Sequence, residues 1–150
     1  MKATRKQTQR GSAVVEIVFI APFMLLLFLG VCDFSLALNV AIDLSNAAFA
    51  GAQFGTSPAQ SSNTTGMKTA ATNDAKGIPG FTVTASKICT CTPGNIQSAS
   101  QVSCSSTCTG YGTPAGYVQV QASATVKTLF PFAPIPATLP VSAIAILRVQ

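Results

Sequence analysis

The chain has 150 residues, of which 48% are hydrophobic and only 9% charged. It therefore has room for one compact domain and a membrane segment, but not for two full cores. Four units of its net charge of +5 come from the first ten residues, which hold Lys2, Arg5, Lys6 and Arg10. From Ser12 onward, five basic residues stand against four acidic ones, a net charge of +1. A nearly neutral folded region does not favour binding to nucleic acid, and no nucleic-acid partner is expected.

A long apolar run follows this basic leader. Ile17 to Cys32 is free of charge, and extension back to Ala13 gives twenty residues with Glu16 as the only charged side chain. Twenty helical residues span about 30 Å, which is the thickness of the hydrocarbon core of a lipid bilayer. The next basic residue after the leader is Lys68. The positive-inside rule therefore predicts a single-pass protein with a cytoplasmic N-terminus and an extracytoplasmic C-terminal domain.

Three other interpretations of this segment stay open. A cleaved secretory signal peptide could be cut near Ser35-Leu36-Ala37, although the apolar run is long for a signal. A lipoprotein would use Cys32, but Val31 is bulky where a small residue normally precedes the lipidated cysteine. The third interpretation is an unprocessed anchor. If Cys32 is not modified, we expect it to be a small buried hydrophobic residue of the membrane helix.

The helical pattern continues beyond the apolar run. Apolar and small side chains recur at 3.6-residue spacing on one side of the predicted helix: Phe34, Leu38, Ala41, Ile42, Ser45, Ala48, Phe49 and Ala52. Polar side chains gather on another side: Ser35, Asn39, Asp43, Asn46 and Gln53. One helix is therefore predicted from about Ser12 to Phe54, half in lipid and half as a stalk, and Gly55 ends it.

Three blocks of this helix carry a family resemblance. Residues 10–16 are Arg-Gly-Ser-Ala-Val-Val-Glu, residues 33–38 are Asp-Phe-Ser-Leu-Ala-Leu, and residues 46–53 are Asn-Ala-Ala-Phe-Ala-Gly-Ala-Gln. In this order and spacing the chain resembles the TadE-like pilus-assembly family over roughly residues 10–55. It departs from the family pattern at Asp33, where Glu is usual, and at Gln53, where Arg is common.

The resemblance implies a non-enzymatic minor pilin or pseudopilin of a Tad-type pilus or secretion apparatus in the inner membrane of a bacterium. Its partners would be the lipid bilayer, other pilin-like subunits, the Tad assembly platform and a prepilin-type peptidase. In pilin-like proteins this peptidase cuts after a glycine and leaves a glutamate at the fifth mature position. Gly11, Ser12 and Glu16 match that pattern, and they are our predicted processing and assembly residues.

Physical chemistry independently singles out Glu16. A carboxylate near the membrane edge is costly unless it reaches the headgroups or meets a positive partner. The α-amino group freed on a neighbouring subunit would be such a partner. The alternative is that Glu16 lies within one turn of the cytoplasmic interface and simply reaches lipid headgroups.

The residues divide into a leader (1–11), a membrane and stalk helix (12–55) and an extracytoplasmic β-rich domain (56–150). We predict an α+β fold: the long helix followed by an antiparallel sheet of three or four strands packed on its apolar face.

Residues 56–66 have the composition of a linker. The domain is expected to contain a short helix over Met67–Lys76, strands over Phe81–Cys91, Tyr117–Leu129 and Val141–Val149, and a proline-rich crossover over Phe130–Pro140. The last strand is apolar on both faces, which predicts a central or doubly covered position.

Four cysteines explain the long loop Thr92–Gly116, which is rich in Ser, Thr and Gly. Cys89 and Cys91 project from the same face of a strand, whereas Cys104 and Cys108 lie within the loop. We expect two disulfides, and a bond between Cys89 and Cys91 is disfavoured by geometry. Nested pairing (89–108 with 91–104) suits a loop that folds back over the strand, and crossed pairing stays open. A four-cysteine zinc site is the competing hypothesis, but the spacings match zinc knuckles poorly.

Nothing in the sequence predicts catalysis. There is no histidine, and the only acidic residues outside the membrane run are Asp33, Asp43 and Asp74. The first two lie ten residues apart on the helix, too far to share a site. No enzyme activity, cofactor or metal is therefore expected. The alternative to an assembly subunit is a membrane-anchored extracytoplasmic binding or adhesion module, which would keep residues 1–11.

Overall fold

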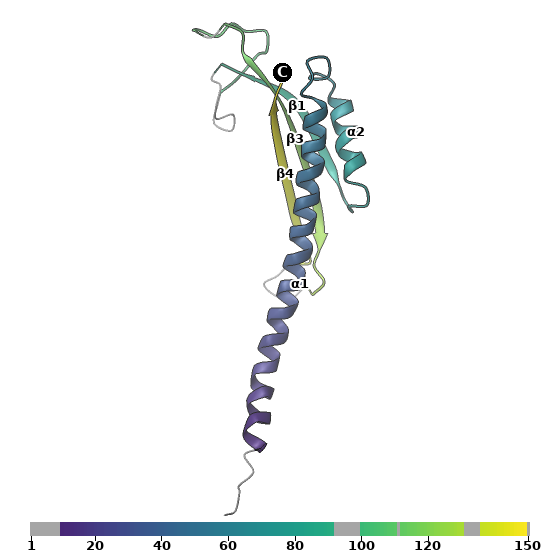
Figure 1. The fold of residues 1–150 in the computed structure, drawn as a ribbon, viewed down its shortest axis with the longest axis vertical. Helices are drawn as coiled ribbons and strands as arrows, with labels where there is room; N and C mark the ends of the chain where they lie inside the picture. Colours follow the sequence, from purple (N-terminus) through teal and green to yellow (C-terminus); the bar gives the residue numbers. More distant parts are fainter. Residues whose placement is uncertain (1–9, 92–99, 111, 131–135, 150) are drawn as a thin grey trace, which may run out of the picture.

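The computed structural model describes residues 10–91, 100–110, 112–130 and 136–149, with side chains from residue 14 onward. Its elements in chain order are α1 (Arg10–Phe54), α2 (Thr64–Asp74), β1 (Thr82–Thr90), β2 (Gln101–Val102), β3 (Ala115–Lys127) and β4 (Thr138–Arg148). The four strands form one antiparallel sheet. The predicted α+β fold, with a long helix followed by a small antiparallel sheet, is confirmed (Figure 1).

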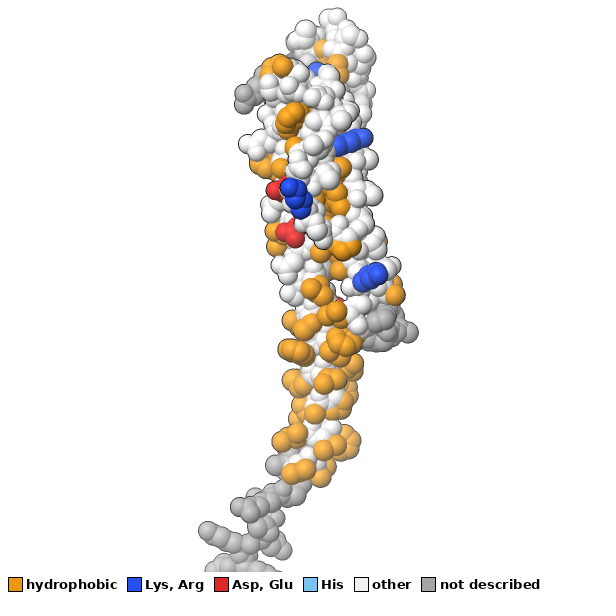
Figure 2. All heavy atoms as spheres, turned by 90° about the vertical axis from the view of Figure 1, so that its right-hand side faces the viewer, with side chains coloured by type: hydrophobic (Ala, Val, Ile, Leu, Met, Phe, Trp, Pro, Cys, Tyr) orange, Lys and Arg blue, Asp and Glu red, His pale blue; other side chains and the backbone are white. Residues whose placement is uncertain are grey.

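The helix α1 is far longer than the domain that it supports. Its 45 residues continue through Pro22 and correspond to a rod of about 65–70 Å. The N-terminal half is bare, whereas the C-terminal half lies against the sheet and α2 (Figure 1). The side chains on the surface of this bare half, which no other element packs against, are mostly apolar (Figure 2). The helix ends at Phe54, as the sequence predicts.

The sheet has the strand order β2-β1-β3-β4, so β3 is central along most of its length. The register aligns Ala85 of β1, Val120 of β3 and Ala145 of β4 in one row across the sheet. These side chains and their alternate neighbours face α1 and α2, because the core contains Val118, Val120, Ala122 and Ala124 together with residues of both helices. The opposite face is polar along β3, where Gln121 and Thr125 are exposed.

Two expectations about the C-terminal region are wrong. β4 is an edge strand, not a central one, and Ile144 on its outward face is 54% exposed. The predicted crossover over Phe130–Pro140 is not required, because the two strands that it joins, β3 and β4, are direct neighbours. Residues 131–135 of this segment lie outside the described residues, and Pro140 pairs with Thr125. Proline is tolerated at a sheet edge. One face of β4 packs on α1, which accounts for its apolar residues, while the other face stays open.

The face of α1 that packs on the domain overlaps the predicted face only in part, at Ala48 and Ala52. The buried side chains are small ones apart from Leu44: Ala47, Ala48 and Ala52. The large side chains of the predicted face, among them Phe34, Ile42 and Phe49, are exposed. Small residues occupy this interface because they let α2 and the sheet approach the backbone of α1 closely.

The short helix α2 begins three residues before the predicted start and ends two residues before the predicted end. Asn63 caps its N-terminus, with its side-chain oxygen accepting a hydrogen bond from the Gly66 N–H at 2.9 Å. The sequence assigned these residues to a linker because they are rich in Ser, Thr and Asn, which are also capping residues. Gly77 has φ of +94° and lies two residues beyond Ala75, which is the C-cap.

The backbone of α1 lies close to α2 at Gly51. A Cβ at this position would lie 2.8 Å from the Met67 carbonyl oxygen and 3.1 Å from the Ala71 Cβ. Gly51→Ala is therefore expected to overpack the interface. The matched control is Gly30→Ala, because a Cβ there meets nothing within 4 Å.

The same gain in helix propensity applies to both variants, so their difference isolates packing. We expect Gly51→Ala to be less stable than Gly30→Ala by about 1–3 kcal/mol. Chemical denaturation of the full chain in detergent micelles measures this difference. Equal stability of the two variants would show that the helices are not in close contact at Gly51.

Candidate functional site

The predicted processing residues lie at the very start of α1. The backbone of Gly11 and Ser12 is helical, within the first turn of α1, and their side chains lie outside the described residues. Glu16 follows on the exposed surface of the helix. It makes no hydrogen bond or ion pair with any other residue in the described part of the chain. The structure therefore positions this carboxylate but leaves its role a prediction.

Glu16 is remote from the folded domain. Seventeen residues separate it from Asp33, and at 1.5 Å per residue this corresponds to about 26 Å along the helix axis. Between them lies the apolar run, and α1 is long and apolar enough to cross a membrane. The side chains next to Glu16, Val15 and Ile17, are exposed as well. The described part of the folded domain therefore supplies no partner for this carboxylate.

An exposed apolar stripe continues from the bare half of α1 along the half that lies against the sheet. We define this stripe by Phe34, Leu38, Ile42 and Phe49, which follow one another at helical spacing. Phe34 is 65% exposed, Ile42 58% and Phe49 51%. The described part of the domain packs on another side of the helix, through Leu44 and its neighbours. The stripe is thus an apolar surface, in the half of α1 that lies against the sheet, that the described part of the domain leaves exposed.

Asp33 connects the helix with the far end of the sheet. Its Oδ1 accepts a hydrogen bond of 2.7 Å from the backbone N–H of Leu129, 96 residues away in the chain. Leu129 follows the end of β3, so this bond ties the β3–β4 connection to α1 where the apolar run ends. The sequence drew attention to Asp33 only through its family resemblance, because no local pattern predicts so distant a partner. A glutamate would place the carboxylate one methylene further from the helix.

The four clustered cysteines form two disulfides at the other end of the sheet. Cys89 is bonded to Cys104, and Cys91 to Cys108, with Cα–Cα distances of 5.1 and 5.4 Å. This is the crossed pairing, so the nested pairing that we favoured is wrong. The reason is the short strand β2, which pairs Val102 directly with Cys89. Because the pairing is antiparallel, the chain runs away from Cys91 after Val102, so Cys104 is within reach of Cys89 and not of Cys91.

The sulfur atoms of these four cysteines are used in the bridges, so this arrangement offers no thiolate ligands to zinc. Among the described residues, no group of three or more His, Cys, Asp or Glu side chains is placed to hold a metal ion. Cys32 on α1 is a free thiol and half-buried.

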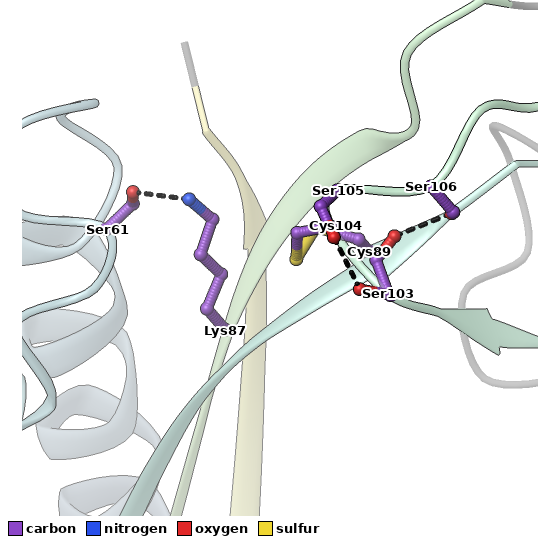
Figure 3. Close-up of a disulfide and its surroundings, with 7 residues drawn as sticks. All are labelled: Ser61, Lys87, Cys89, Ser103, Cys104, Ser105 and Ser106. Atoms are coloured by element: carbon purple, nitrogen blue, oxygen red, sulfur yellow. Dashed lines mark hydrogen bonds between the residues drawn. A yellow bond between two sulfur atoms is a disulfide. The ribbon is translucent and has the colours of Figure 1, made fainter.

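A partly buried hydrogen bond near the disulfides was also not predicted from the sequence. Lys87 Nζ donates to Ser61 Oγ at 3.0 Å, and this serine hydroxyl donates to the Pro58 carbonyl oxygen at 3.0 Å. Ser61 is buried in the α1–α2 connection, whereas Lys87 lies on β1, two residues before Cys89 (Figure 3). The contact therefore joins the α1–α2 connection to the disulfide-bonded end of β1. Ser106 Oγ donates to the Ser103 carbonyl oxygen at 2.6 Å on the other side of the bridge (Figure 3).

These features define a class of protein. One apolar helix is uncovered in its N-terminal half and packs against a small antiparallel sheet in its C-terminal half, which is an α+β architecture. Residues 11–53 match the model of the TadE-like protein family, so the resemblance seen in the sequence is confirmed over this segment. The match ends one residue before the end of α1 and does not include the sheet. No curated protein and no solved structure matched the chain. A TadE-like segment indicates involvement in Tad pilus assembly.

Proposed function

We propose that this protein is a non-enzymatic minor pilin or pseudopilin that takes part in assembling a Tad-type pilus or secretion apparatus. In this proposal α1 spans the inner membrane of a bacterium once, with the sheet domain outside the cytoplasm. A prepilin-type peptidase removes residues 1–11, and the processed chain joins other pilin-like subunits through α1 on the assembly platform. The family match over residues 11–53 supports the assignment of the protein to a Tad system.

The observation that carries the proposal is the exposed apolar stripe of α1. Outside a membrane, full burial of a large apolar side chain contributes about 1.5–3 kcal/mol. A protein that acted alone would gain this stabilisation by packing Ile42 and Phe49 under its own sheet. Instead the sheet packs on the small residues around Ala48. The large side chains are left free for a neighbouring helix, which is what an assembly subunit requires.

In this proposal Glu16 fixes the axial shift between the α1 helices of neighbouring subunits. Removal of residues 1–11 would give Ser12 a free α-amino group, which has a reference pKa near 7.7–8.0 and is largely protonated at neutral pH. In a bundle of parallel helices this cation pairs with Glu16 of a neighbour shifted along the axis. The low dielectric of the surroundings strengthens the attraction. The pair would also remove the cost of an isolated carboxylate in an apolar bundle.

The mass of the native protein tests this function. We expect protein isolated from its host to lack residues 1–11 and to begin at Ser12. Intact-mass spectrometry of the membrane and filament fractions measures this directly. A full-length chain in a cell with an active peptidase would contradict the proposal.

The disulfide-bonded end of the sheet favours a second function. Two bridges brace a segment at the end of the domain farthest from the bare half of α1, where a surface or ligand would be met first (Figure 1). A membrane-anchored binding or adhesion module would use this end and keep its N-terminus. The same mass measurement separates the two functions, because only the assembly subunit is processed.

A further inference from the structure

The β3–β4 end of the sheet lies at the level of α1 where the apolar run stops. Asp33 directly follows Cys32, the last residue of that run, and its carboxylate accepts the hydrogen bond from the Leu129 N–H. In Figure 1 this end of the sheet lies beside α1, at the border between the bare half and the covered half. The hydrogen bond thus sets the height of Leu129 along the helix.

The side chains at this end are apolar and exposed. Leu129 is 56% exposed and Phe130 43%, and Leu139 on β4 is exposed beside them. Lys127 is the nearest charged residue on β3, and no other charge follows it in the sequence until Arg148. Exposed aromatic and aliphatic side chains beside one lysine are typical of segments that lie at a membrane surface, where the lysine reaches the headgroups.

The depth of these side chains follows from the length of the apolar run. If the twenty residues that end at Cys32 cross the hydrocarbon core of about 30 Å, Asp33 lies at its outer boundary. The headgroup layer beyond that boundary is about 5–8 Å thick on each side. A direct hydrogen bond of 2.7 Å places the Leu129 backbone at the height of Asp33. Leu129 and its neighbour Phe130 therefore lie within this layer.

We propose that Leu129 and Phe130 form a second membrane contact, inserted into the outer boundary between headgroups and acyl chains beside α1. The occupant of this apolar surface is lipid, because the surface is continuous with the membrane-spanning part of α1. This inference rests on the proposed spanning role of α1. The domain is then held to the bilayer at two points, so it stands in one orientation to the membrane. A subunit that leaves the membrane must withdraw both contacts.

Tryptophan fluorescence tests this contact without interference, because the chain contains no tryptophan. The full-length variants Phe130→Trp, Phe49→Trp and Phe23→Trp would be reconstituted in phosphatidylcholine vesicles. Two vesicle preparations carry bromine on the acyl chains, close to the headgroup in one and close to the chain end in the other. Phe49 is the matched control, because it is similarly exposed but lies about 24 Å above Asp33 along the helix. Phe23, in the apolar run, reports whether α1 crosses the bilayer.

We expect Phe23→Trp to be quenched most by the deep bromine. Interfacial side chains lie about 5–10 Å into the boundary between headgroups and acyl chains, so Phe130→Trp should lose roughly half of its emission to the shallow bromine. Phe49→Trp should remain unquenched in both preparations. Leu129→Trp should repeat the result of Phe130→Trp if that variant folds poorly.

Each other outcome has one meaning. Quenching of Phe23→Trp without quenching of Phe130→Trp and Leu129→Trp would overturn the second contact and leave the membrane span intact. A blue-shifted but unquenched emission from Phe130→Trp would also overturn it, because the side chain would then be buried against protein. Loss of quenching at Phe23→Trp would instead overturn the membrane span on which the proposed function depends.

Discussion

Glu16→Ala is expected to abolish incorporation of the protein into filaments while its membrane insertion stays intact. Glu16 is exposed and makes no contact with the described part of the domain, so its removal should not disturb folding. In the assembly, however, the variant leaves the α-amino group of a neighbouring Ser12 without its partner. Truncating one member of a desolvated charge pair costs about 2–5 kcal/mol, which corresponds to roughly 30-fold weaker association or more.

The experiment compares membrane and filament fractions from the native host by immunoblot. Glu16→Gln keeps the shape of the side chain and removes its charge, so it should fail as Glu16→Ala does. Gly11→Leu should fail differently, because blocked cleavage would keep the full-length chain in the membrane. Wild-type levels of Glu16→Ala in filaments would refute the charge pair. Assembly of an uncleaved Gly11→Leu chain would refute the processing step.

Removal of one complete disulfide should cost less stability than removal of one cysteine from each bridge. Cys89→Ser with Cys104→Ser deletes one bridge, which closes a loop of 15 residues, and leaves the other bridge able to form. The expected loss in the free energy of unfolding is about 3 kcal/mol. Cys89→Ser with Cys108→Ser leaves Cys91 and Cys104, which are not partners in the structure. It should lose both bridges, and roughly twice as much stability.

Thiol counting on denatured, unreduced protein from the bacterial periplasm distinguishes these pairings. The first double variant should show one free thiol, that of Cys32, as the wild-type protein does. The second should show three, because Cys91 and Cys104 are then free as well. A single free thiol in the second variant would support the nested pairing. Five free thiols in the wild-type protein would show that neither bridge forms.

The helix and its end could be predicted from the sequence because both depend on local properties. A charge-free run of sufficient length specifies a helix that can cross a membrane, and the first turn-forming residues after Phe54 end that helix. The alternation along β3 predicts a strand because side chains on successive residues point to opposite faces. The family resemblance over residues 10–55 depends on the same local order of residues, and the family model confirms it over 11–53.

Predictions that depended on the position of one element relative to another were wrong. The apolar pattern of β4 is compatible with a central strand, but only the antiparallel pairing with β3 reveals that it lies at the edge. The buried face of α1 includes Ala48 and Ala52 of the predicted face but not its large side chains, because backbone approach matters more there than side-chain volume. The two-residue strand β2 is too short to leave a periodic signal.

The sequence alone therefore determined the long apolar helix, the α+β class and the residues that carry charge and sulfur. Only the tertiary structure decided which of them meet. It paired Cys89 with Cys104, and it joined Asp33 to a backbone N–H 96 residues away. It also turned Phe49 and the rest of the stripe away from the sheet. These outcomes depend on strand register and on the rotation of α1 about its axis, which are settled by packing between segments remote in the chain.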